Sequence, residues 1–450
     1  MKIVIAGAHA VGTHLAKLLA QDNMDVTLMD ADESRITQMT FMNLITVVGS
    51  PTSINALRSA GVPQCDLFIA VTPQESVNVH ACILAANLGA RRTVARIASY
   101  EMQKEESAMF YRRIGVSRLV YPEMLGGQSI AGTIKRPWAR QSIELCDGHL
   151  LLLGVKVRAG APIVGQSLIE IGKKHHESFH VAAIKRGDDL IIPLATDCIE
   201  AEDLVYFFTM PSKADVVRSA CGKKLRHLHR VIILGGNRLG VQTCYYLPKD
   251  FDVVFIEQDE QRGEYVQERV PKAMMVKGVK GDVETLSELN VDEHDVFVAL
   301  GDNAEQNILS CLTAKKLGVG KTVVEVNDLE QVTMAQNLNI GSTVNKKMLT
   351  ASSIYQMLLD ADKTSAKCFS LVDAEVADLE ARPGSYITSA PVMKLRLPKG
   401  ITLGGLVRGG KGQTVTGPTQ IQAGDHVVVV CENRMIPVVE RLFVKASLFS

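Results

Sequence analysis

The chain has 450 residues, of which 49 are basic and 49 acidic, so its formal net charge at pH 7 is zero. Because domains usually hold about 100–200 residues, this length predicts more than one domain. The even charge argues against a general nucleic-acid binder, and the nine cysteines without a CxxC pair argue against a secreted disulfide framework.

The first third of the chain alternates short apolar strands with helices. The chain opens with a strand at 3–6, too short for a signal peptide, followed by a helix at 11–21. Further strands are predicted at 26–29, 45–48, 67–71 and 93–97, with helices at 34–42, 53–60, 77–88 and 100–114. Apolar strands that alternate with helices indicate a parallel sheet covered on both faces, a Rossmann-type arrangement.

A different pattern follows Pro137, which ends the preceding helix and marks a boundary. Strands are predicted at 150–157, 190–193 and 204–208, with a short helix at 167–171. This order indicates a small β-rich lobe with one helix. No apolar run reaches the ~18 residues of a membrane-spanning helix, so we expect a soluble, cytosolic protein.

The whole plan occurs twice. Residues 3–12, IVIAGAHAVG, return 228 positions later as VIILGGNRLG, and Arg186 and Asp203 return 222 positions later as Arg408 and Asp425. We therefore predict an α/β fold with two Rossmann-like parallel-sheet lobes, each followed by a small β-rich α+β lobe, formed by tandem duplication. The expected bounds are 1–136 and 142–214 for the first pair of lobes, 215–229 for a linker, and 230–362 and 366–450 for the second pair.

Each Rossmann-like lobe opens with a glycine-rich turn between a strand and a helix. In the pattern G-x-G-x-x-G such a turn holds a pyrophosphate at the helix N-terminus. The first and last glycines are present in both halves, as Gly7, Gly12, Gly235 and Gly240. His9 and Asn237 replace the middle glycine. Both residue types tolerate positive φ, so we expect the turns to persist with less room for phosphate, and a protonated His9 could add a compensating charge.

A carboxylate ends the second strand of each half, Asp30 in the first and Glu257 in the second. At this position a carboxylate accepts from ribose hydroxyls and repels a 2′-phosphate, which favours NAD or an adenosine ribose over NADP. After the third strand the first half has Ser50, whereas the second half has Asp282. The alternative is that both turns are remnants that serve only as folding cores.

Two other functions stay open on the residues alone. An NAD-dependent oxidoreductase would need an acid or base outside the Rossmann-like lobe, and His175, His176 and His180 are the candidates, although a solvated polar loop is their expected place. No spacing predicts a metal site. The basic run 223–230 could be a nucleic-acid or lipid patch, but a solvated linker is favoured.

The chain resembles the TrkA family, the tandem-RCK (regulator of potassium conductance) regulatory subunits of bacterial Trk potassium uptake systems. The resemblance covers essentially the whole chain and rests on the doubled glycine turns, on Asp30 and Glu257, and on the related runs 61–97 and 289–318. It implies a nucleotide-sensing cytosolic subunit, not an enzyme, that gates a Trk-type membrane potassium transporter from the inner face of the plasma membrane. We expect it to self-associate into a dimer or tetramer ring, with the apolar faces of the small lobes and the helix near 348–359 as subunit contacts, and not to bind nucleic acid.

The resemblance also implies a set of residues around NAD(H) or ATP/ADP. In the first half these are Gly7, His9, Val11, Gly12, Asp30 on the ribose, Ser50, Thr72 and Arg96. In the second half they are Gly235, Asn237, Leu239, Gly240, Glu257, Asp282 and Gly301. Glu325 stands where the first half has Arg96, which removes a phosphate partner and predicts that the two halves differ in ligand or affinity.

Overall fold

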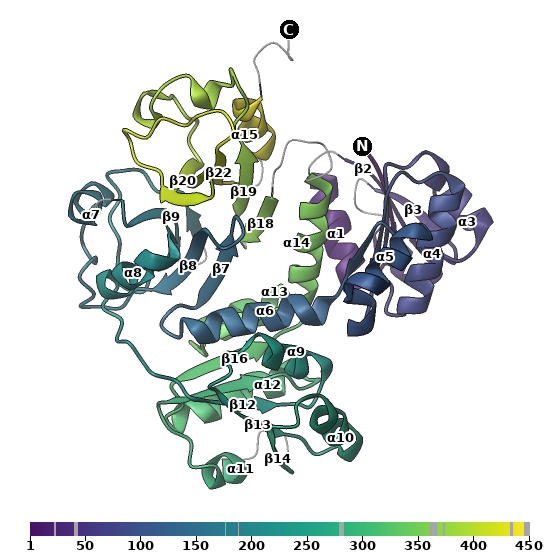
Figure 1. The fold of residues 1–450 in the computed structure, drawn as a ribbon, viewed down its shortest axis with the longest axis horizontal. Helices are drawn as coiled ribbons and strands as arrows, with labels where there is room; N and C mark the ends of the chain where they lie inside the picture. Colours follow the sequence, from purple (N-terminus) through teal and green to yellow (C-terminus); the bar gives the residue numbers. More distant parts are fainter. Residues whose placement is uncertain are drawn as a thin grey trace. The chain divides into compact units, whose positions relative to one another are not determined.

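The computed structural model describes every residue except 22–23, 40–43, 176, 188, 279–282, 360–366, 372–373, 433–434 and 445–450 (Figure 1). The chain forms two compact units. The first holds residues 1–126 and 345–357, and the second holds 127–344 and 358–450. Within these units, four sheets follow one another along the chain in the order parallel, antiparallel, parallel, antiparallel.

The first sheet is parallel and has the strand order β3-β2-β1-β4-β5-β6. Its strands are β1 (Lys2–Ala6), β2 (Asp25–Asp30), β3 (Ile45–Val48), β4 (Leu67–Ala70), β5 (Thr93–Arg96) and β6 (Arg118–Val120). Its helices are α1 (Ala10–Gln21), α2 (Glu33–Thr37), α3 (Ile54–Ser59), α4 (Glu75–Leu88) and α5 (Glu105–Arg113), with 3₁₀ turns η1 (Val62–Gln64) and η2 (Tyr100–Gln103). The sequence pattern missed β6 because three residues are too few to show a period.

The third sheet repeats this order as β14-β13-β12-β15-β16-β17. Its strands are β12 (Arg230–Leu234), β13 (Asp252–Ile256), β14 (Met274–Val276), β15 (Asp295–Ala299), β16 (Lys321–Glu325) and β17 (Ser342–Val344). Its helices are α9 (Arg238–Tyr246), α10 (Glu260–Arg269), α11 (Val283–Glu288), α12 (Ala304–Lys316) and α13 (Leu329–Asn337). The predicted pair of Rossmann-like lobes is confirmed. In such a sheet, ligands bind where the strand order reverses, at the carboxyl ends of the first and fourth strands.

Two long helices cross between the halves. Helix α14 (Lys346–Leu359) follows β17 in the chain, but residues 345–357 belong to the first unit, where Ala351 and Ile354 are fully buried. Helix α6 (Pro122–Lys135) continues into the second unit, where a Cβ added at Gly127 would lie 2.8 Å from the backbone of Gln242 in α9. The buried side of α14, expected to make subunit contacts, is thus already covered by its own chain.

The two small lobes are antiparallel five-stranded sheets. The first has β7 (Gln141–Leu145), β8 (Leu150–Lys156), β9 (Phe179–Arg186), β10 (Asp189–Ile191), β11 (Leu204–Thr209), α7 (Leu168–His175), η3 (Pro211–Lys213) and α8 (Ala214–Ala220). The second has β18 (Lys367–Leu371), β19 (Ala374–Glu380), β20 (Ile401–Arg408), β21 (Lys411–Thr414), β22 (His426–Glu432), η5 (Tyr386–Thr388), η6 (Val392–Lys394) and α15 (Ile436–Phe443). Helix α8 covers the start of the predicted linker and buries Val217 in the first small lobe, whereas 223–229 holds no helix or strand.

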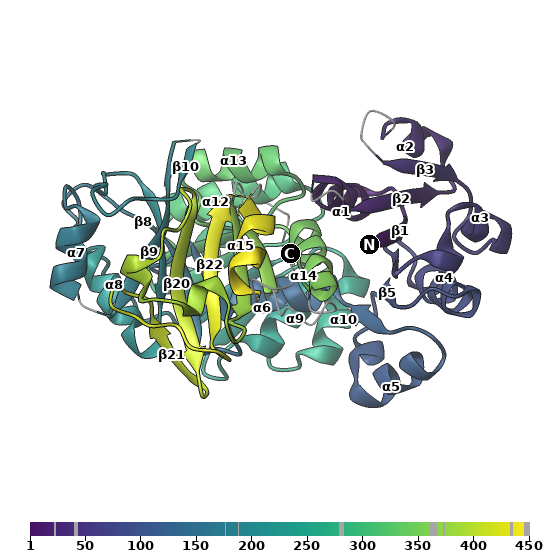
Figure 2. The same cartoon turned by 90° about the horizontal axis from the view of Figure 1, so that it is seen from above.

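The small-lobe sheets pack on each other around one core, and β9 lies beside β20 (Figure 2). The contact is close, because a Cβ added at Gly404 would lie 1.7 Å from the Phe208 ring. His180 and Thr402 are equivalent positions, 222 residues apart, and their Nε2 and Oγ1 atoms are 2.9 Å apart. Contact between equivalent residues indicates an approximate twofold axis. The apolar faces expected to make subunit contacts therefore meet inside the chain.

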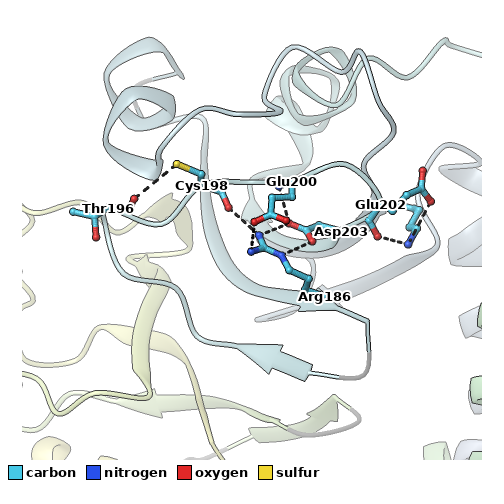
Figure 3. A network of polar contacts seen from close by, with 7 residues as sticks. Arg186, Thr196, Cys198, Glu200, Glu202 and Asp203 are labelled. Atoms are coloured by element: carbon cyan, nitrogen blue, oxygen red, sulfur yellow. Dashed lines mark hydrogen bonds and ion pairs between the residues drawn. The ribbon is translucent and has the colours of Figure 1, made fainter.

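An arginine–aspartate pair explains the 222-residue repeat. Arg186 donates from Nε and Nη2 to the two carboxylate oxygens of Asp203, at 3.0 and 2.9 Å (Figure 3). Arg408 and Asp425 repeat this pair at 2.8 and 2.6 Å. Both aspartates are 1% exposed, and in each lobe the bidentate arginine satisfies both buried carboxylate oxygens.

Candidate functional site

The first glycine turn joins β1 to α1 and has no room for side chains at its glycines. Gly7 has φ +112°, and a Cβ there would lie 2.9 Å from the Thr72 nitrogen. A Cβ at Gly12 would lie 1.8 Å from the Gly7 carbonyl oxygen. The strained conformation therefore sits at the first glycine. The turn persists as expected, and His9 does not use its tolerance of positive φ, because Gly7 already makes the reversal. Helix α1 starts at Ala10, so its unpaired N–H groups face the turn.

The Asp30 side chain stabilises this turn by accepting hydrogen bonds from its backbone. Its side chain is almost buried, and its Oδ2 accepts from the Ala8 N–H at 2.7 Å while Oδ1 accepts from the Asp32 N–H at 2.9 Å. Arg35, which the sequence reading did not single out, has its Nη1 3.5 Å from Asp30 Oδ1. Arg35 lies in α2, five positions after Asp30, and this short spacing was the signal in the sequence that could have identified it.

Arg35 also donates to His9 Nε2, at 2.9 Å. Burial first, and then the charge of Arg35, lower the pKa of His9 below 6.5. His9 is thus neutral at pH 7 and accepts a hydrogen bond. In this structure Arg35, and not a protonated His9, therefore supplies the positive charge next to the turn.

The second glycine turn joins β12 to α9 with the same backbone. Gly235 has φ +107°, and a Cβ there would lie 2.9 Å from the Leu300 carbonyl oxygen. Asn237 is extended, with φ −105°, and likewise does not use its tolerance of positive φ. Its side chain caps α9 by accepting from the Gly240 N–H at 3.0 Å and donates to the Leu300 carbonyl at 2.5 Å. The asparagine is therefore a helix cap in this turn.

Glu257 takes the role of Asp30 in the second turn. Its Oε2 accepts from the Gly236 N–H at 2.7 Å, and its Oε1 accepts from the N–H groups of Gln258 and Asp259 at 2.8 and 3.0 Å. The arginine equivalent to Arg35 is Arg262, which pairs at 2.9 Å with Asp302. In this half the arginine's charge is therefore neutralised by an exposed carboxylate.

Next to each glycine turn, a buried asparagine is hydrogen-bonded to the backbone that follows the fourth strand of the sheet. Asn78 Oδ1 accepts from the Thr72 N–H at 2.9 Å, and its Nδ2 donates to the carbonyls of Thr72 and Arg96, both at 2.9 Å. Asn307 bonds in the same way to Gly301, at 2.8 and 2.9 Å, and to the Glu325 carbonyl at 3.3 Å. These asparagines were not among the site residues predicted from the sequence, although they lie at matching positions of the related runs 61–97 and 289–318. They tie the end of the fourth strand to the end of the fifth beside each turn.

The remaining predicted positions differ in what they can offer. Arg96 ends β5 and donates from Nη1 to the Thr72 carbonyl at 3.4 Å, so its charge lies at the turn. Glu325, at the same place in β16, is 8% exposed. Ser50 is exposed, with its hydroxyl 2.9 Å from that of Thr52.

Val11 and Leu239 have buried side chains, so only their backbone groups can meet a ligand. Asp282 lies outside the described residues. Its predicted counterpart was Ser50, next to Gly49, and the packing points to a different alignment. A Cβ at Gly49 would lie 2.6 Å from Ala56, and one at Gly278 would lie 2.7 Å from Thr285, so Gly278 is the structural equivalent of Gly49.

The structure gives the histidine candidates for an oxidoreductase structural roles. His180 is in strand β9 and not in a loop, because its ring fits the core between the small lobes beside Thr402. Burial lowers the pKa of His180 to about 4. His175 ends α7 and lies 5.2 Å from the Phe179 ring, and His176 lies outside the described residues.

Within the described part of the chain, no group of three or more His, Cys, Asp or Glu side chains could hold a metal ion. No described helix is long and apolar enough to cross a membrane.

Comparison with known proteins gives consistent matches. The model of the TrkA-N domain matches residues 3–122 and 231–346, and that of the TrkA-C domain matches 152–222. The chain is 31% identical over 458 residues to the Trk system potassium uptake protein TrkA of Vibrio alginolyticus, covering 100% of both chains. It is 30% identical over 451 residues to the protein of that name from Halomonas elongata, covering 98% of both chains.

Two solved structures share the fold. The GsuK RCK domain has a TM-score of 0.60 at 15% identity and covers 98% of this chain and 94% of that chain. The GsuK channel bound to NAD has a TM-score of 0.59 at 16% identity, covering 98% and 78%. At these identities the likeness shows a common architecture, which agrees with the sheet order described above.

Proposed function

The chain belongs to the TrkA family, and we propose that it is a nucleotide-binding regulatory subunit that controls a Trk-type membrane potassium transporter. The observation that carries this proposal is the pair of complete glycine turns, each with a buried carboxylate behind it. Gly7 and Gly235 have the same strained φ, and Asp30 and Glu257 accept from equivalent backbone N–H groups. Two turns kept in this detail favour ligand binding over the alternative of folding remnants.

The ligands that fit are adenine nucleotides with a free ribose 2′-hydroxyl, NAD(H) or ATP/ADP. The N-terminus of α1 or α9 would hold the phosphates, and the carboxylate would accept from the ribose. A relative in fold, the GsuK channel, was solved with NAD, and another GsuK structure with ADP. We propose that both turns bind, through the residues named from the sequence except Asp282, which the packing does not align with Ser50.

The charges around the two turns favour different nucleotides. At the first turn Arg35 lies 3.5 Å from Asp30, and Arg96 donates to the Thr72 carbonyl. In the second half Arg262 is paired with Asp302, and Glu325 replaces Arg96. We therefore assign the more highly phosphorylated ATP and ADP to the first turn and NAD(H) to the second.

Regulation would follow from unequal binding to two arrangements of the lobes. A ligand can shift such an equilibrium only by its difference in affinity for the two states, and a few kcal/mol is enough. The proposed lobe bounds are those given above from the sequence, and the proposed assembly is a dimer or tetramer ring on the cytoplasmic side of the transporter subunit. The chain would act without catalysing a reaction.

A flux experiment tests this function. The transporter subunit is reconstituted in vesicles, and potassium uptake is measured with the chain alone and with ATP, ADP, NAD or NADH. We expect uptake that depends on the chain and changes with nucleotide, and a smaller nucleotide effect with Asp30→Asn. Flux that ignores the chain under all conditions, or steady consumption of NADH by the chain, would contradict the proposal.

A further inference from the structure

A basic cavity lies in the second unit, and no residue of either glycine turn lines it. It has a volume of about 350 Å³ and is lined by the first small lobe, by the segment after α8 and by the second Rossmann-like lobe. We call it the junction pocket and define it by Arg140, Lys156, Arg158, Lys223, Lys315 and Lys321. A cavity of this size is within the range that holds small ligands, about 300–1,000 Å³.

The lining of the junction pocket is strongly positive. Eight of its 18 lining residues are lysine or arginine, and none of these described lining residues is aspartate or glutamate. Among the described residues, the lining forms ion pairs with one carboxylate, because Glu202 Oε2 lies 3.0 Å from Arg158 and 3.6 Å from Lys156. Glu202 is half exposed, so it screens these two charges only weakly.

Three cations of the pocket, Lys321, Arg140 and Lys315, are hydrogen-bonded to neutral groups, and no ion pair of the described residues joins them to a carboxylate. Lys321 is 6% exposed and donates to the Ala139 carbonyl at 2.6 Å. Arg140 donates to the side-chain oxygen of Asn339, and Lys315 donates to the Asn339 carbonyl. Such bonds orient the cations but leave their positive charge in place, a costly arrangement inside a protein.

The protonation of these lysines reflects the same crowding. Burial, and then the charge of Arg140, lower the pKa of Lys321 to about 7. Burial, followed by Arg140 and Arg158, also lowers the pKa of Lys315. An anion in the pocket would reverse these shifts, because opposite charge favours the protonated form.

We propose that the junction pocket binds a small multivalent phosphate-bearing anion, held by Arg140, Arg158, Lys315 and Lys321. The guanidinium groups match phosphate oxygens in pairs, and the lysines add point charges around them. Among the described residues no ion pair joins Arg140, Lys315 or Lys321 to a carboxylate, and Arg158 has the half-exposed Glu202. An anion with several negative charges complements this lining, and a phosphate chain supplies them in a volume of this size. Lys223 belongs to the basic run 223–230, which we expected from the sequence to be a solvated linker. In this proposal the run contributes to anion binding.

The test titrates inorganic triphosphate into the full-length chain at low salt, in two buffers that differ in ionisation enthalpy. We expect one triphosphate per chain, with net proton uptake near pH 7.5 as Lys321, whose pKa is about 7, becomes protonated. Arg158→Gln with Lys315→Gln, both exposed at the mouth and so tolerant of change, should weaken binding on the order of tenfold. Lys399→Gln with Lys411→Gln removes the same charge from the exposed surface and should leave binding unchanged.

Further titrations identify the source of the phosphates and the limits of the proposal. Competition by ATP and ADP against triphosphate would show that nucleotide phosphates enter the pocket, whereas triphosphate binding without competition would indicate inorganic polyphosphate. Asp30→Asn should leave the triphosphate affinity unchanged, which separates this pocket from the first turn. No binding of triphosphate, or an equal loss in the two charge-neutralised pairs, would overturn the proposal.

Discussion

The two Rossmann-like lobes share a backbone and differ in charge. Gly7 and Gly235 make the same reversal, and a carboxylate holds each turn in the same way. Around the first turn a neutral His9 accepts from Arg35, whereas Asn237 caps the helix of the second and has no cation bonded to it among the contacts described above. Duplication thus preserved the part that sets backbone shape, while the side chains that would distinguish one phosphate ligand from another changed.

The largest difference should appear when a methyl group is added at the last glycine of each turn. Gly12→Ala should destabilise the protein by about 3 kcal/mol, because its Cβ would lie 1.8 Å from the Gly7 carbonyl oxygen. Gly240→Ala should cost about 1 kcal/mol, since its Cβ meets the edge of the Phe255 ring at 2.8 Å, and a ring can shift. Denaturant unfolding measures both. Equal losses would mean that the two turns are equally tight.

The buried asparagines should show what the two lobes share. Asn78→Ala or Asn307→Ala should each cost about 2 kcal/mol, because each leaves backbone groups at the strand ends without partners. The two losses should agree within about 1 kcal/mol. Urea unfolding of both variants, with a surface Asn87→Ala control, provides the comparison. A loss of stability in only one of the two variants would show that Asn78 and Asn307 do not play equivalent roles.

The paired arginines should separate the turns by ligand affinity. Arg35→Ala should weaken ATP binding at the first turn about tenfold, because it removes the cation next to Asp30. Arg262→Ala should change the affinity of the second turn for NAD(H) by less than about twofold. Its partner Asp302 is exposed, and exposed ion pairs contribute little. Calorimetry on both variants measures these effects. A larger effect of Arg262→Ala would reverse the assignment of ligands.

The smallest expected effect is a pH dependence at the first turn alone. The folded protein holds the pKa of His9 below 6.5, and a bound phosphate would raise it. Proton uptake then accompanies binding, so ATP affinity should rise a few-fold as pH falls through the range below 6.5. His9→Asn should make the dependence flat, as Asn237 does in the second turn. A pH dependence unchanged in His9→Asn would exclude His9 as its source.

The sequence predicted the features that local pattern controls. Strand and helix order, the duplication, the glycine turns and the carboxylates of Asp30 and Glu257 were all visible, because each depends on residues close in the chain or at a fixed spacing. The edge strands β6 and β17 were missed because three residues carry no period. His180 was misplaced in a loop because a polar residue in a strand that faces another lobe does not look apolar from sequence.

Long-range contacts were outside the reach of pattern. The assignment of α14 to the first unit depends on tertiary packing between segments more than 200 residues apart in the chain. The same holds for the junction pocket, whose cations come from three separate stretches. The position of Arg35 on α2 could have been predicted from the sequence. Its hydrogen bond to His9 could not, because that contact depends on the three-dimensional course of the glycine turn.

Calorimetric titration of ATP, ADP, NAD and NADH into wild-type protein, Asp30→Asn and Glu257→Gln tests the central claim most directly. The substitutions keep the size of each side chain and remove its charge. A thermal unfolding curve for each variant serves as the control that it is folded. We predict two nucleotide sites per chain, with the first weakened only by Asp30→Asn and the second only by Glu257→Gln. Absence of heat with all four nucleotides, or unchanged binding in both variants, would contradict the account.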